Sequence, residues 1–112
     1  ENILYNELVA RGFCVDVGVV TYNSTTEDGK LKHSKLEIDF VVNKGYQRYY
    51  IQSALNVDTT EKREQETKSL LKVDDSFLKM VVLKDEIIPW KDDKGILYIG
   101  IQEFLTDYIN KL

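Results

Sequence analysis

Two oxygen-bearing side chains stand at a spacing that could hold a divalent cation. Asp39 lies in an alternating stretch, residues 36–42, and Gln52 lies in the aromatic and β-branched stretch after a short turn. With the turn at residues 44–47, an antiparallel pairing places Asp39 opposite Gln52, close enough to share a ligand. Magnesium prefers such oxygen ligands, and the bound ion activates water and stabilises charge on a phosphate. The hairpin therefore predicts a cation site.

Glu7 offers a third oxygen ligand from a predicted N-terminal helix. It lies on the side of that helix that carries the leucines, where a carboxylate needs a partner or a function. A lysine beside such a site would orient the water or balance charge. The position two residues after Gln52, where that lysine is expected, holds Ala54. The predicted site has oxygen ligands but no ammonium group of its own.

Asp39 and Gln52 also have structural interpretations. Asp39 would pair with Arg48 or Lys44 beside the turn, and the same register places Asn43 opposite Arg48. Gln52 would hydrogen-bond the opposite strand or Asp39 itself. Under this interpretation the hairpin needs no metal.

The remaining candidates have alternatives of the same kind. Glu7 would cap a strand or pair with Arg11, four residues further along the helix. Lys62 and Lys68, on the following helix, would serve as a relocated catalytic lysine, although exposed helical lysines are usually only solvated.

The rest of the sequence predicts an α/β fold, with a mixed central sheet flanked by helices. In chain order we expect a helix at 1–12, strands at 12–22, 36–42 and 48–55, a helix at 58–73, strands at 77–84 and 96–101, and a helix at 102–112. The polar stretch 23–35 is expected to form an exposed loop or the tip of a long hairpin.

Two local patterns make sharper predictions. Alternation in residues 36–42 places Ile38 and Phe40 on the same face of their strand. Asp58 and Glu61 have the spacing of a capping box at the start of the second long helix.

Composition limits the classes of function. The 112 residues suit one domain, residues 1–112, and 43% hydrophobic with 30% charged residues is ordinary for a globular protein. The net charge of −4 argues against broad binding to nucleic acid, so Tyr49, Tyr50 and Trp90 are expected to pack rather than stack on bases. The only cysteine, Cys14, is expected in the core and favours a reducing cytoplasm. No apolar run is long enough to span a membrane.

Four segments together resemble the C-terminal domain of a bacterial and archaeal family of AAA-type P-loop ATPases. These segments are ENILYNELVARGF, LEIDFVVNKGYQRYYIQSAL, EKREQETKSLLKVDDSFLKMVVLKD and GILYIGIQEFL, and they cover nearly the whole chain. The resemblance implies a restriction-endonuclease-like fold related to the PD-(D/E)xK nucleases. In that pattern Glu7, Asp39 and Gln52 match the acidic positions, and Ala54 takes the place of the lysine.

The resemblance also implies a cytoplasmic ATP-binding protein. Because this chain contains no GxxxxGK[ST], ATP would bind an N-terminal ATPase part outside it, and we expect the chain to begin inside a longer protein. Our first hypothesis is a degenerate nuclease-like module that binds or regulates, with the ATPase domain as its partner. The second is an active nuclease that uses Mg or Mn and a relocated lysine. The third is a plain interaction domain that mediates homo-oligomers, which the exposed edge of a mixed sheet would allow. Besides the ATPase domain, the candidate partners are protein or nucleic acid, and no membrane is expected.

Overall fold

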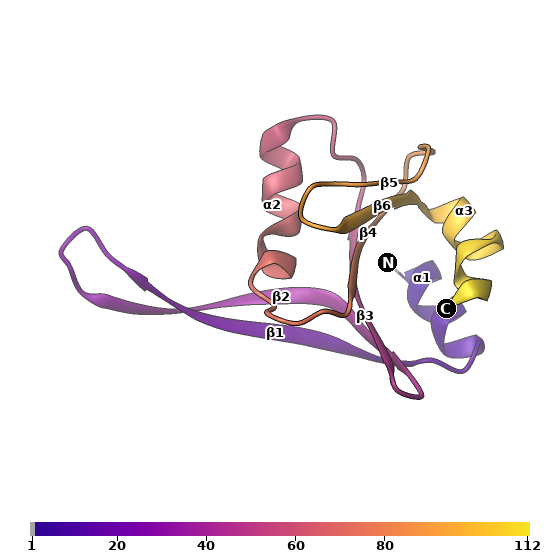
Figure 1. The fold of residues 1–112 in the computed structure, drawn as a ribbon, viewed down its shortest axis with the longest axis horizontal. Coiled ribbons are helices and arrows are strands. Elements are labelled where there is room, and N and C mark those ends of the chain that lie inside the picture. The colour runs from indigo at the N-terminus through magenta and orange to yellow at the C-terminus, as the bar shows by residue number, and fades with distance from the viewer. Residues whose placement is uncertain (1) are drawn as a thin grey trace.

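The computed structural model describes residues 2–112, with side chains from Ile3 onward, and shows a six-stranded mixed sheet with helices on both faces (Figure 1). In chain order the elements are α1 (Asn2–Ala10), β1 (Cys14–Thr25), β2 (Leu31–Lys44), β3 (Gln47–Ala54), α2 (Thr60–Leu71), β4 (Leu78–Leu83), β5 (Trp90–Lys91), β6 (Ile96–Gly100), α3 (Ile101–Thr106) and the 3-10 helix η1 (Tyr108–Lys111). The predicted α/β class with a mixed, helix-flanked sheet is confirmed.

The sheet combines an antiparallel half with a parallel half. Its strand order is β1-β2-β3-β4-β6-β5. Strands β1, β2 and β3 are antiparallel, whereas β3, β4 and β6 are parallel, and β5 returns antiparallel to β6. Helix α2 supplies the crossover that the parallel β3–β4 pair requires. Sequence patterns do not indicate β5, because a two-residue strand beside Pro89 carries no periodicity.

Two hydrophobic cores lie on opposite faces of this sheet. Helices α1 and α3 cover one face, where Leu4, Leu8 and Phe104 pack on alternate residues of the central strands. Helix α2 covers the other face, where Leu70 packs among residues that include Tyr98. Because each central strand is covered on both sides, β4 and β6 are continuous apolar runs rather than alternating ones.

The end of α1 and the start of α2 each have an identifiable cause. Glycine at position 12, with a φ of +89°, closes α1 in a Schellman motif, with the Phe13 N–H bonded to the Leu8 carbonyl at 3.1 Å. The predicted start at Glu1 lies outside the described residues. Helix α2 is capped by Thr59, whose hydroxyl accepts the Lys62 N–H at 3.1 Å. The predicted capping box at Asp58 is therefore wrong by one residue, because the threonine hydroxyl takes the capping position.

The polar stretch 23–35 forms the end of a long hairpin, which confirms the second of the two expected forms. Strands β1 and β2 stay paired out to Thr25 and Leu31, and a short turn with Gly29 at a φ of +78° joins them. Figure 1 shows this two-stranded ribbon projecting far beyond the helices. We refer to residues 18–38 as the arm.

A β-bulge lies at the base of the arm. The β1–β2 register passes from Asp16–Val41 to Gly18–Ile38, so that two β2 residues, 39 and 40, oppose one residue of β1. The extra residue reverses the alternation of β2.

The bulge changes which face each apolar residue covers. Ile38 packs in the core beneath α2, whereas Phe40 packs in the core beneath α1. The prediction that these two residues share a face is wrong, because alternation holds only in a strand without a bulge. The prediction for Cys14 is also wrong: it is exposed at the start of β1.

We predict that Gly18→Ala destabilises the fold by about 1–3 kcal/mol, because overpacking displaces neighbours. A Cβ at Gly18 would lie 2.5 Å from Val41 Cγ2 and 3.1 Å from Ile38 Cβ, at the bulge. Urea unfolding measures the loss, with Lys35→Ala, at an exposed position of β2, as control. Equal stability of the two variants would show that the bulge accepts the added methyl group.

Candidate functional site

Asp39 and Gln52 meet where β2 separates from β3. The β2–β3 pairing ends at Phe40 and Ile51. Beyond it, the Asp39 N–H donates to Gln52 Oε1 at 2.7 Å, and the Ser53 N–H donates to Asp39 Oδ2 at 2.9 Å. Two side chains thus take the place of ladder hydrogen bonds that the departing strand no longer provides. We call this arrangement the junction.

Gln52 also ties the junction to α2. Its Nε2 donates to the Glu66 carbonyl at 3.2 Å and to Ser69 Oγ at 3.1 Å. Only 8% of Gln52 is exposed, and both ends of its carboxamide are hydrogen-bonded. The side chain is therefore held by three elements: β2, β3 and α2.

A second carboxyl group lies close to the junction. Burial, and then the negative charge of Asp39, raise the pKa of Glu66 above its usual value of 4.5. Sequence reasoning missed Glu66 because the middle of α2 is almost wholly polar. Only the fold reveals which of its charges faces the sheet.

Glu7 does not join this group. Helix α1 packs on the sheet face opposite α2, whereas Gln52 points toward α2. The Glu7 carboxylate instead pairs with the Arg11 Nε at 3.4 Å, which is the structural alternative predicted from the sequence. Arg11 also bonds Asn110 and the Leu105 carbonyl. The pair therefore helps to attach α1 to the C-terminal segment.

Neither Arg48 nor Lys44, the two cations suggested from the sequence, pairs with Asp39. Arg48 Nε donates to Asn43 Oδ1 at 3.0 Å, and Lys44 Nζ lies 4.9 Å from the Phe13 ring. The predicted ion pairs of Asp39 with Arg48 or Lys44 are wrong, because the carboxylate accepts a backbone N–H instead. The predicted register is confirmed, since Asn43 pairs with Arg48.

No ammonium group replaces the expected lysine at the junction within residues 2–112. Ala54 packs against the core beneath α2. Lys62 Nζ donates to Asn56 Oδ1 at 3.3 Å, and Lys68 Nζ lies 6.0 Å from the Tyr22 ring. Across the described part of the chain, no three His, Cys, Asp or Glu side chains are grouped to hold a metal ion.

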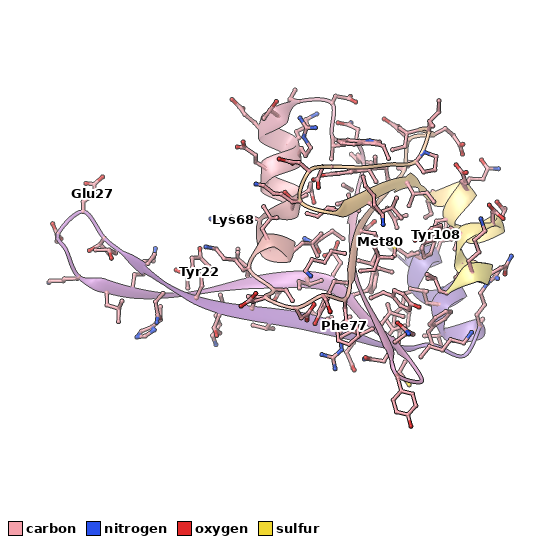
Figure 2. All side chains as sticks on the ribbon, in the orientation of Figure 1. Tyr22, Glu27, Lys68, Phe77, Met80 and Tyr108 are labelled. Carbon is pink, nitrogen blue, oxygen red and sulfur yellow. The ribbon has the colours of Figure 1, made fainter. Side chains whose placement is uncertain are left out.

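A separate groove of about 590 Å³ lies between α2 and the turn that joins β5 to β6. Four basic and three acidic side chains line it: Arg63, Lys68, Lys72, Lys94, Glu64, Asp92 and Asp93. In Figure 2, Lys68 projects from α2 toward Tyr22 on the arm. The near balance of charge gives no strong attraction for phosphates.

Of the aromatic side chains considered for base stacking, Tyr49 and Tyr50 are buried, whereas Trp90 is 38% exposed beside its stacking partner. Tyr49 and Tyr50 are 8% and 6% exposed. Trp90 stacks on Tyr98, with ring centroids 4.3 Å apart, and the Arg63 guanidinium lies 5.6 Å from the Trp90 ring. The Tyr98 hydroxyl donates to Asp92, an aspartate that sequence reasoning missed although the Asp-Asp-Lys-Gly turn marks it.

Comparison with protein-family models, with curated proteins and with solved structures finds no match for this chain. No helix in residues 2–112 is long and apolar enough to cross a membrane.

We predict that Gln52→Leu lowers the free energy of unfolding by about 2–3 kcal/mol, because it leaves the Asp39 N–H without a partner and removes the hydrogen bonds from Nε2 to the Glu66 carbonyl and Ser69 Oγ. Gln47→Leu, at an exposed position of the same strand, should stay within about 0.5 kcal/mol of wild type. Urea unfolding compares the two variants. A loss at Gln52 no larger than at Gln47 would rule out a structural role for the carboxamide.

Glu66→Gln should stabilise the protein at neutral pH but not in acid. Because folding raises the pKa of Glu66, its contribution to stability is present below the unfolded value near 4.5 and is lost as the pH rises through the folded pKa. Glutamine does not ionise, so the variant does not lose this stability as the pH rises. Urea midpoints at pH 4 and pH 7 measure the difference, with Glu64→Gln as control. A stabilisation that is equal at both pH values would contradict the assigned cause.

Proposed function

We propose that this chain is a non-catalytic binding or regulatory module with a restriction-endonuclease-like fold, the degenerate C-terminal accessory domain of a cytoplasmic AAA-type ATP-binding protein. The family and fold name rest on the sequence resemblance. ATP would bind the N-terminal part of that protein, and its ATPase domain would be the natural partner of this one.

The observation that carries the proposal is that the three side chains matching the nuclease pattern all make structural contacts within the fold. The Asp39 carboxylate accepts the Ser53 N–H, and the Gln52 oxygen accepts the Asp39 N–H. Glu7 pairs with Arg11 on helix α1, which covers the face of the sheet opposite α2. Metal-dependent phosphate chemistry needs several oxygen ligands converging on one ion. Here only two of the three predicted ligands lie together, and both support the backbone.

The alternative function is a nuclease that uses Mg or Mn. It would use the carboxyl groups of Asp39 and Glu66. Burial raises the pKa of Glu66, and the nearby negative charge of Asp39 raises it further. The nuclease would also need Lys62 or Lys68 to leave its present contact and reach the junction. That rearrangement makes it the weaker candidate.

Cleavage assays on single-stranded and double-stranded DNA and RNA, with Mg or Mn, distinguish the two functions. We expect no cleavage by the wild-type chain and no saturable binding of Mn in a calorimetric titration. Asp39→Asn is the matched control, since its amide oxygen still accepts the Ser53 N–H but lacks the negative charge that a metal needs. Cleavage that is present in wild type and lost in this folded variant would establish the nuclease instead.

A further inference from the structure

The arm lacks the support that the rest of the sheet has. Pairing between β2 and β3 ends at Phe40, so residues 31–38 of β2 have β1 as their only strand neighbour among the described residues. Figure 1 shows the outer part of the ribbon projecting beyond the helices, whereas Ile38 and Tyr22, nearer its base, still contact α2. The longest dimension is 50 Å, and the radius of gyration of 14.9 Å exceeds the roughly 13 Å of a compact domain of this length. A two-stranded ribbon is marginally stable alone and gains from a third strand.

Strand β1 is an unprotected edge. It is the first strand of the sheet, and its 12 residues contain one charged side chain, Asp16, with no lysine and no proline. Val17 and Val19 are 65% and 59% exposed. Natural edge strands usually carry lysine, proline or short length to prevent pairing with other chains. A long, apolar edge without these features is suited to pairing.

The direction of the free backbone groups follows from the turn of the arm. The Thr26 N–H donates to the Lys30 carbonyl at 2.8 Å, so this pair faces inward across the ribbon. Inward and outward pairs alternate in an antiparallel ladder. Counting back along the arm, Val20 and Tyr22 bond β2. The amides and carbonyls of Val19 and Thr21 point outward from the edge.

We propose that β1 pairs antiparallel with β1 of a second copy of this chain, about a two-fold axis near Val19 to Thr21. The strand is complementary to itself in this arrangement, because an axis at Val19, Val20 or Thr21 places Asp16 opposite an uncharged residue, and no like charges oppose; these residues are Tyr22, Ser24 and Thr26, respectively. The pairing gives each arm a third and a fourth strand. It joins the two six-stranded sheets into one continuous sheet.

A second copy fits this edge better than an unrelated peptide does. The outer part of the arm extends beyond the helices (Figure 1), so antiparallel pairing lays each arm along the base of the other β1 strand. The β1 edges of both copies are thereby covered by the same contact, as the isologous interface of a two-fold dimer requires. The contact uses none of the junction residues. It therefore stands whether or not the proposed loss of catalysis is correct.

Sedimentation velocity over a wide concentration range tests the pairing. We expect wild type to pass from monomer to dimer as concentration rises. Val19→Pro removes an outward N–H and spares the ladder with β2, and Val19→Lys places charges near the two-fold axis. Each should raise the dissociation constant at least about tenfold, or 1.4 kcal/mol. Leu55→Lys, at a similarly exposed residue beyond β3, should behave as wild type.

Amide hydrogen exchange gives a second readout that does not depend on the variants. The Val19 and Thr21 amides should become protected only as concentration rises, whereas the Val20 and Tyr22 amides should be protected throughout. A wild-type chain that stays monomeric at every concentration overturns the proposal. So does a dimer that both Val19 variants leave unchanged, because it must then form through another surface. Nuclease activity, measured separately, bears on the proposed function and not on this pairing.

Discussion

The separation of β2 from β3 is the constraint on which the rest of the structure depends. At that point the amides of Asp39 and Ser53 lose their ladder partners, and a buried polar group without a partner costs about 1–3 kcal/mol. The Asp39 carboxylate and the Gln52 carboxamide supply the missing acceptors. This allows β2 to leave the sheet, form the arm with β1 and still be joined through Gln52 to α2.

The same residue types suit a cation site and a backbone support, which is why the sequence left both interpretations open. Carboxylate and carboxamide oxygens accept hydrogen bonds from N–H groups as readily as they bind magnesium. The register near the turn could be predicted from the pattern, and it correctly brought Asp39 near Gln52. Which partner each oxygen takes depends on where β2 separates from β3, and alternation of apolar residues carries no sign of that point.

Long periodic segments were predictable, whereas features set by tertiary contacts were not. The apolar runs that form β4 and β6 and the leucines of α1 indicated their elements directly. The arm was harder to predict because polar residues such as His33 are exposed there on both faces. Glu7 was misleading as a ligand candidate, since helical spacing places it beside leucines but cannot say which face of the sheet its helix covers. Glu66 was missed for the same reason, whereas Thr59 was missed because the adjacent Asp58 is an equally suitable N-cap residue by type.

The most direct test of the structural role of the junction is amide NMR with and without Mg²⁺. If Asp39 and Gln52 serve the backbone, the Asp39 and Ser53 amides exchange slowly with solvent, and Mg²⁺ leaves their resonances and the Gln52 side-chain amide unchanged. Saturable shifts centred on these three groups as Mg²⁺ is added would contradict the account, because they would show that the oxygens are available to a metal ion.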